Sequence, residues 1–161
     1  MRPSAGGESM QMSAAGLDLL KRSEGFRSRT YLDAAGLPTI GYGHQLVHPE
    51  CFPNGITEAQ AAEILASDLR DSEQAVVRLV KAALTQGQFD ALVDFCFNVG
   101  SGKLAASTLL KDLNAGEYDA AAEQLLRWDH VGSQEIAGLE ARREAEFQLW
   151  GDNAARQEAA A

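Results

Sequence analysis

The fold class of this chain is decided by the segment Ser23-Glu-Gly-Phe-Arg-Ser-Arg-Thr-Tyr-Leu-Asp-Ala-Ala-Gly-Leu-Pro-Thr-Ile-Gly-Tyr-Gly-His44. Before it, Ser13 is a suitable N-cap for a short helix that ends at Gly25. After Gly25, turn residues replace the helical period, and Pro38 favours an extended conformation for the residue before it. Asp33-Ala-Ala-Gly36 fits a turn between two extended pieces. The segment therefore predicts a short helix followed by a compact β-hairpin.

The rest of the chain predicts helices. Two capping boxes, at residues 57–60 and 85–88, each begin one. The second of these helices is apolar around most of its circumference, which is typical of the buried centre of a helical lobe. Further helices are predicted near residues 107–113, 119–128 and 137–149. The first capping box opens a long helix with an apolar stripe at helical spacing, made of Ala62, Leu65, Leu69, Val76 and Val80.

This order of elements predicts an α+β, predominantly α fold with two lobes. A small N-terminal β-hairpin lobe and a larger helical lobe would be joined by the long helix, and a cleft between two lobes is a natural ligand site. Residues 1–12 are expected to be a flexible segment, residues 13–150 a single catalytic domain, and residues 151–161 a loose tail. The alanines of that tail could also extend a helix.

Composition excludes several classes of function. With 161 residues and a net charge of −9, the chain suits one domain that lacks the basic face needed to bind nucleic acid. No run of residues is long and apolar enough for a membrane anchor, and the N-terminus has no apolar signal core. The two cysteines, Cys51 and Cys96, are too few for a disulfide framework or a metal site, and we expect both to be incidental thiols.

Three polar residues in the opening segment suggest chemistry. Glu24 stands at a helix C-terminus, where the helix dipole disfavours the ionised carboxylate and so favours the protonated form that a general acid requires. Asp33 and Thr39 can approach each other across the hairpin, where a carboxylate and a hydroxyl can orient one water. An acid on one side and an activated water on the other is the arrangement for inverting hydrolysis of a glycosidic bond.

Each of these residues also has a structural interpretation when it is taken alone. Asp33 is a common turn-former, Thr39 an ordinary strand residue, and Glu24 could form a surface ion pair with an arginine. Gly41-Tyr-Gly43 is only a weak phosphate-loop signal, because no helix start follows it. The three histidines lack metal-ligand spacing, so neither a metal nor a cofactor is expected.

Taken together, the segment from Glu24 to His44 resembles the catalytic segment of the bacteriophage-type lysozymes, the muramidases of glycoside hydrolase family 24 that act as endolysins. Glu24, Asp33 and Thr39 reproduce the catalytic spacing of that family. The resemblance continues through the stretch 89–100, includes Ser107-Thr-Leu-Leu, ends at 138–146, and spans about residues 14–150.

The resemblance implies a role for each site residue. Glu24 would donate a proton to the leaving sugar oxygen, Asp33 would act on water, and Thr39 would help to hold that water. Phe97 and Asn98 would touch the glycan strand. Either Arg142 or Arg143 would orient Glu24, and the sequence leaves that choice open.

The resemblance also implies a substrate and a life cycle. The enzyme would hydrolyse the β-1,4 bond between N-acetylmuramic acid and N-acetylglucosamine in peptidoglycan. As a soluble monomer, it would wait in the host cytoplasm until a holin, which it need not contact, opens the inner membrane to the periplasm. The acidic net charge departs from the many basic members and disfavours adhesion to the anionic wall. The alternative hypothesis is a catalytically silent module of the same fold that binds peptidoglycan or a partner protein.

Overall fold

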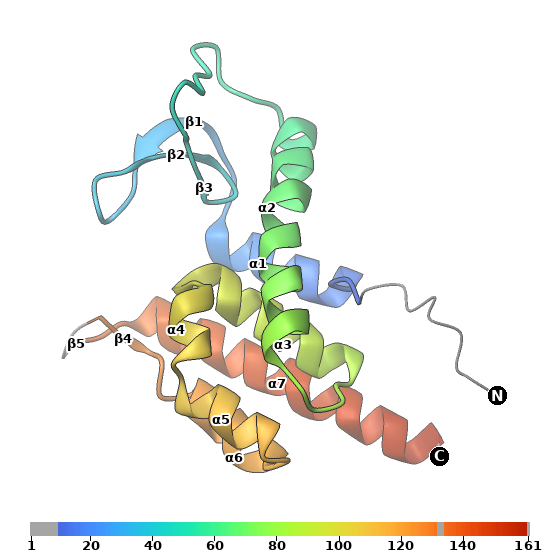
Figure 1. Ribbon diagram of the computed structural model, residues 1–161. Helices are drawn as coiled ribbons and strands as arrows, with labels where there is room; N and C mark the ends of the chain where they lie inside the picture. The colour runs from blue at the N-terminus through green and yellow to red at the C-terminus, as the bar shows by residue number, and fades with distance from the viewer. Residues whose placement is uncertain (1–9, 132–133, 161) are drawn as a thin grey trace.

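The computed structural model describes residues 10–131 and 134–160. Within them a small sheet and a set of helices form two lobes, and one long helix runs between them (Figure 1). The predicted α+β, predominantly α architecture is confirmed. Described residues 10–12 belong to the predicted flexible segment, but Met10 and Met12 pack against the core. The remainder of that segment lies outside the described residues.

The opening segment forms the helix end and the hairpin that it predicts, and the helix packs on the helical lobe while the strands make up the first lobe. Helix α1 (Ala14–Glu24) has Ser13 as its N-cap and is followed by strands β1 (Arg27–Leu32), β2 (Pro38–Gly41) and β3 (His44–Gln45). The strands form an antiparallel sheet in the order β1-β2-β3, with an irregularity in the β1–β2 register between positions 27 and 31. A turn after Asp33 joins β1 to β2, as predicted, with the Gly36 N–H donating to the Asp33 carbonyl at 2.9 Å.

Helix α2 (Glu58–Leu79) connects the lobes and contacts both β2 and α3. Its predicted capping box is present: the Gln60 N–H donates to Thr57 Oγ1 at 3.1 Å, and the Thr57 N–H donates to Gln60 Oε1 at 2.8 Å. The buried stripe differs slightly from the predicted one, because it begins at Ala61 and includes Ala75, while Ala62 is only half-buried.

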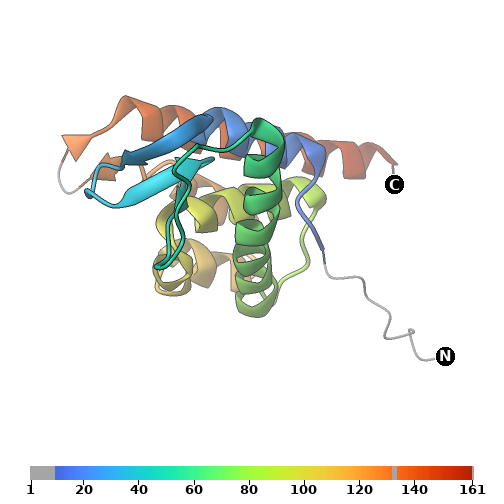
Figure 2. The same cartoon turned by 90° about the horizontal axis from the view of Figure 1, so that it is seen from above.

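Helix α3 (Gln86–Val99) is the centre of the second lobe, as its apolar circumference predicts. Every residue from Gly87 to Cys96 is buried. It packs most extensively against α7 (Ala137–Ala160) and also contacts α1, α2 and α4 (Ser101–Ala105). In the view from above, α1 and α7 run side by side along one edge of the molecule (Figure 2), in agreement with their contacts. The C-terminal helix therefore reaches the end of α1, where Glu24 lies.

The remaining elements differ in detail from the prediction. Helices α5 (Thr108–Asn114) and α6 (Tyr118–Leu125) lie where they were expected, but α6 ends before Trp128. The sequence pattern missed α4, a five-residue helix too short to show a period. It also missed the two-residue strands β4 (His130–Val131) and β5 (Gln134–Glu135).

The C-terminal segment is helical where a loose tail was expected. Helix α7 continues to Ala160, so residues 151–160 extend it. This segment holds several alanines, which have the highest helix propensity of any residue. The domain boundary placed at residue 150 therefore does not coincide with the end of a helix.

Candidate active site

Glu24 is the last residue of α1 and faces the junction of the two lobes. The helix ends there because Gly25 adopts φ 71°, a conformation that favours glycine, and its N–H closes the helix on the Lys21 carbonyl at 2.9 Å. The Glu24 side chain is 20% exposed. It lies against the turn between β2 and β3, since a Cβ atom added to Gly43 would meet Glu24 Oε2 at 2.7 Å. Glycine at position 43 is therefore what leaves room for the carboxylate.

Arg142 is the arginine that reaches Glu24, which answers the question that the sequence left open. Its Nη1 donates to Glu24 Oε1 at 2.7 Å. Its Nε and Nη2 donate to the two carboxylate oxygens of Asp94 on α3, both at 2.9 Å. Burial alone would lower the pKa of Arg142, but Asp94 and Glu24 outweigh it and raise that pKa above its usual value. The guanidinium thus stays charged and is held in one orientation by Asp94.

Arg143 takes a separate, fully buried position. Its Nη2 donates to Asn98 Oδ1 at 2.7 Å and lies 3.0 Å from Glu146 Oε1, a contact with the geometry of an ion pair rather than of a hydrogen bond. Its guanidinium carbon lies 5.0 Å from the centre of the Phe95 ring. Burial lowers the pKa of Arg143. Arg143 therefore lies next to the Glu24–Arg142–Asp94 set and engages the carbonyl oxygen of Asn98, a residue that was predicted to touch glycan.

Glu146 is the acidic partner in this buried cluster. It is wholly inaccessible to solvent. Its burial and the neighbouring Asp94 carboxylate raise its pKa well above the usual value, and the two arginines oppose that shift. A protonated Glu146 would avoid placing a third negative charge near Glu24 and Asp94.

Asp33 is fixed by the turn that it begins. Its Oδ1 accepts hydrogen bonds from the backbone N–H groups of Ala35 at 2.8 Å and Leu37 at 2.9 Å. Its Oδ2 accepts from Gln45 Nε2 at 3.2 Å. These hydrogen bonds, the one from Leu37 above all, lower the pKa of Asp33 and keep it ionised. The turn-forming and the catalytic interpretations of Asp33 are therefore compatible. The turn uses Oδ1, and Oδ2 points toward Gln45 on β3.

Thr39 lies on the central strand, directly opposite Tyr31 on β1 and Gln45 on β3. Residues opposite each other share one face of a sheet, and Asp33, two positions after Tyr31, extends the same face. By this alternation Asp33 and Thr39 lie toward one face of the hairpin, where Gln45, opposite Thr39, also donates to Asp33 Oδ2. The Thr39 hydroxyl donates to the Leu37 carbonyl at 2.9 Å, so it can only accept a hydrogen bond from a water.

Tyr31 links this face electrostatically to Glu24. Burial raises the pKa of its hydroxyl, and the negative charges of Glu24 and Asp33 add to that shift, while Arg27 opposes it. The Arg27 guanidinium lies 4.7 Å from the centre of the Tyr31 ring. The Tyr31 hydroxyl is therefore close enough to both carboxylates for their charges to affect its pKa.

His44 joins the sheet to the neighbouring loop and to α2. Its Nδ1 lies 2.7 Å from Asp68 Oδ2, and its Nε2 lies 2.9 Å from Glu50 Oε2. Burial lowers its pKa, but the two carboxylates raise it to a net value above the usual one. Burial also raises the pKa of Asp68 by more than His44 lowers it. His44 therefore has a structural role, because its hydrogen bonds join β3 to α2 and to the loop that holds Glu50.

The side chains of three other residues considered in the sequence analysis make none of the hydrogen bonds described above. Cys51 is exposed and Cys96 is buried, both as free thiols, and Phe97 is half-buried against the core. Among the described residues, no group of His, Cys, Asp and Glu side chains is placed to hold a metal ion. In the same part of the chain, no helix is both long and apolar enough to cross a membrane.

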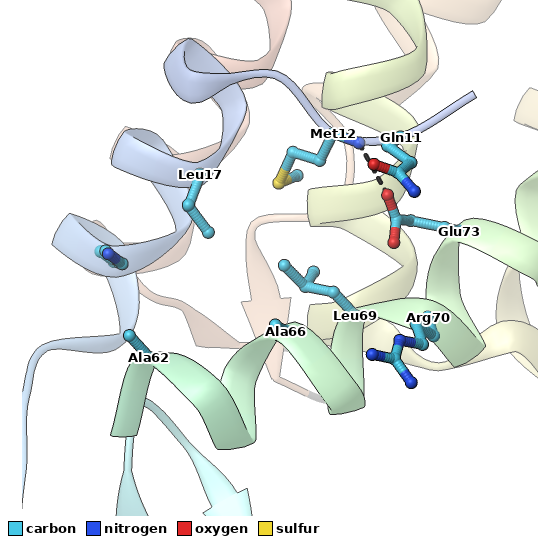
Figure 3. Close-up of a pocket in the computed structure, with 9 residues that line it drawn as sticks. Gln11, Met12, Leu17, Ala62, Ala66, Leu69, Arg70 and Glu73 are labelled. Carbon is cyan, nitrogen blue, oxygen red and sulfur yellow. Dashed lines mark hydrogen bonds between the residues drawn. The ribbon is translucent and has the colours of Figure 1, made fainter. Parts of the chain in front are cut away.

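A cavity of about 290 Å³ lies elsewhere, between the start of α1 and one face of α2. Figure 3 shows Met12 and Leu17 on one side of it and Ala66 and Leu69 on the other. The Met12 N–H closes one end by donating to Glu73 Oε2 at 2.7 Å. None of the predicted catalytic residues lines this cavity, so it is distinct from the candidate active site.

Sequence reasoning missed Asp94 and Gln45. A signal for Asp94 was present, because a carboxylate within an otherwise apolar, fully buried helix must have a charged or hydrogen-bonding partner. Gln45 gave no comparable signal, since a polar residue at the end of a strand is common on any surface.

Comparisons with known proteins show which sequences and structures resemble this chain. Residues 21–146 match the family model described as phage lysozyme. The endolysin of Salmonella phage P22 is 41% identical over 137 residues, which are 83% of this chain and 94% of that protein. The endolysin of Bacillus phage B103 is 43% identical over 145 residues, or 88% of this chain, but the match spans only 54% of that longer protein.

Solved structures give the same result. A P22 lysozyme mutant superposes with a TM-score of 0.78 at 39% identity, covering 88% of this chain and 98% of that one. The muramidase domain of SpmX from Asticaccaulis excentricus superposes with a TM-score of 0.80 at 35% identity, covering 88% and 97%.

Proposed function

This chain belongs to the phage lysozyme family and is a peptidoglycan-hydrolysing endolysin, and we propose that Glu24, Asp33 and Thr39 carry out its muramidase chemistry. The observation that carries the proposal is the division of the site between the lobes. Glu24 is held by Arg142 of the helical lobe, whereas Asp33 and Thr39 share one face of the sheet. A glycan strand lying between them would meet an acid and a base on different sides.

Glu24 supplies the proton in this mechanism. In its protonated form it gives a proton to the glycosidic oxygen as the bond to C1 of N-acetylmuramic acid breaks, which releases the 4-hydroxyl of N-acetylglucosamine. The carboxylate that remains accepts the Nη1 hydrogen bond of Arg142. That charge-assisted bond stabilises negative charge as it develops on Glu24, where it lowers the barrier.

Asp33 and Thr39 direct the water. Asp33 Oδ1 already accepts two backbone hydrogen bonds, so Oδ2 is the oxygen with capacity for a further donor. The Thr39 hydroxyl has its own proton engaged with Leu37, so it also accepts. A water that donates one O–H to each keeps a lone pair free to attack C1, and Asp33 takes its proton. Attack from the face opposite the leaving group would invert the anomeric carbon.

The glycan contacts and the conditions of action are further parts of the proposal. Phe97 lies at the end of α3 next to Asn98, whose amide nitrogen is the part not engaged by Arg143. We assign these two residues to the substrate strand. The enzyme would act as a monomer on the periplasmic peptidoglycan after a holin releases it from the host cytoplasm. Lysis that requires co-expression of a holin, together with a monomeric mass in sedimentation, would support this account.

Product analysis of Glu24→Gln tests the proposed chemistry. Wild type should release muropeptides with a reducing N-acetylmuramic acid end from purified Gram-negative sacculi, and Glu24→Gln, properly folded, should release none. Products with a 1,6-anhydro end would exclude the role of the water held by Asp33 and Thr39. Binding to sacculi with no products from either protein would instead indicate a silent binding module, which the comparisons with known lysozymes do not favour.

A further inference from the structure

We infer that Gln45 is a positioning residue for the nucleophilic water, acting by fixing the second oxygen of Asp33. The inference rests on the proposed role of Asp33 as base. Gln45 lies at the end of β3, directly opposite Thr39, and its Nε2 donates to Asp33 Oδ2 at 3.2 Å. It therefore contacts one of the two groups that are to hold the water and is the strand neighbour of the other.

The hydrogen bond from Gln45 is not needed for the turn. The two backbone donors that hold the turn, from Ala35 and Leu37, both bind Oδ1. A carboxylate fixed through one oxygen can still rotate its other oxygen. Gln45 binds that other oxygen and sets its direction toward the face that Thr39 shares.

The side chain of Gln45 is also free for this role. Gln45 is exposed, so it contributes little to the core. Its amide has two N–H donors and one carbonyl acceptor, and in the described part of the chain only the bond to Asp33 engages it. The second donor and the carbonyl oxygen are thus available to the water or to a sugar hydroxyl at the reacting bond.

A structural role and a positioning role predict different pH profiles. A hydrogen bond donated to an ionised carboxylate favours that form, and the Gln45 bond is one of those that lower the pKa of Asp33. Gln45→Leu removes the donor, so the acid limb of the pH–kcat profile should move to higher pH. Gln45→Glu places a second carboxylate beside Asp33, so the limb should move further in the same direction.

The experiment measures kcat and KM from pH 3 to 9 on soluble, uncrosslinked peptidoglycan strands for wild type, Gln45→Leu and Gln45→Glu. Gln74→Leu, at an exposed site on α2, is the matched control. We expect Gln45→Leu to lower kcat about tenfold with little change in KM, as for one lost hydrogen bond to a charged group. An unmoved acid limb in both Gln45 variants, or a raised KM with unchanged kcat, overturns the inference.

Asp33→Asn in the same assay separates this inference from the proposed function. If Asp33→Asn retains activity, the proposed role of Asp33 fails, and the role of Gln45 fails with it. If Asp33→Asn is inactive while both Gln45 variants behave like the Gln74→Leu control, only the role of Gln45 fails. Thermal unfolding of each variant verifies that it is folded at the assay temperature.

Discussion

Asp94→Asn should impair both the stability of this enzyme and its catalytic rate. The Asp94 side chain is fully buried and holds two of the three donor groups that Arg142 uses, while the third reaches Glu24. An amide in place of the carboxylate would set one N–H group against a guanidinium N–H group. The arginine then loses its anchor, and the geometry of its bond to Glu24 is no longer fixed.

The size of the effect on stability follows from burial. Breaking a buried ion pair by removing one charge costs about 3–5 kcal/mol. The loss should be near the lower end, because removing the Asp94 charge removes one cause of the raised pKa of Glu146. Glu146 can then ionise beside the arginines and compensate in part. About 3 kcal/mol corresponds to a fall in Tm of about 6–12 °C for a domain of this size.

The compensation by Glu146 also makes the loss of stability in Asp94→Asn depend on pH. A carboxyl group with a raised folded-state pKa contributes stability that is present below its unfolded-state pKa and is lost as pH rises through the folded value. In Asp94→Asn this loss is smaller, because the Glu146 pKa is less raised. The destabilisation relative to wild type should therefore be larger near pH 5 than near pH 8.

The rate should fall because a displaced Arg142 no longer stabilises the charge on Glu24. A misplacement of about 1 Å can cost about 100-fold in rate, so we expect a loss of that order in kcat. Asp90→Asn is the matched control. Asp90 is a buried carboxylate one turn earlier on α3, where it binds Ser13 and Gln86 and not the arginines.

The assay compares urea unfolding with kcat on soluble strands, at a temperature where every variant is folded. Asp90→Asn should lose stability and keep the wild-type kcat. If Asp94→Asn is destabilised but retains the wild-type kcat, the anchoring of Arg142 has no part in catalysis. If Asp90→Asn loses as much kcat as Asp94→Asn, the effect is one of stability alone, and the reasoning is refuted.

Three further predictions concern glycine, histidine and cysteine. Gly43→Ala should lower kcat strongly, since the added Cβ would lie 2.7 Å from Glu24 Oε2. Gly36→Ala is the control, because Gly36 has a similar φ of 78° but no atom within 4 Å, so its substitution should cost only about 1–2 kcal/mol of stability. Equal kcat in the two variants would contradict the contact. The difference in free energy of unfolding between wild type and His44→Asn should shrink from pH 6 to 9. Glu50 and Asp68 raise the folded-state pKa of His44 despite burial, so the stability that His44 contributes is complete below about pH 6.5 and is lost as pH rises through the folded value. A difference in urea unfolding that does not depend on pH would refute this. Cys51 should react with a thiol reagent in the native protein and Cys96 only after unfolding, since Cys96 is buried and burial raises its pKa. The double variant Cys51→Ser, Cys96→Ala should keep full activity. Two fast-reacting thiols in the native state would contradict the burial of Cys96.

The sequence by itself determined the local structures that carry the catalytic groups. The end of α1 at Glu24, the turn at Asp33 and the strand at Thr39 lie within one short segment, and each follows from a nearby glycine, proline or turn-forming side chain. The capping boxes of α2 and α3 were equally local and equally predictable. Such features need only contacts between residues a few positions apart, so a pattern of residue types is enough to identify them.

Only the tertiary structure decided which groups surround those residues. Arg142 and Arg143 are adjacent on one helix and differ by about 100° in direction, so the packing of α7 on α3 selects the one that meets Glu24, 118 positions away. The same packing places Asp94 under Arg142 and buries Glu146 beside them, with the resulting rise in its pKa. Gln45 likewise gains its partner from the register of β3 on β2. Burial and long-range pairing depend on how whole helices and strands pack against each other. The residues adjacent in sequence do not specify that packing.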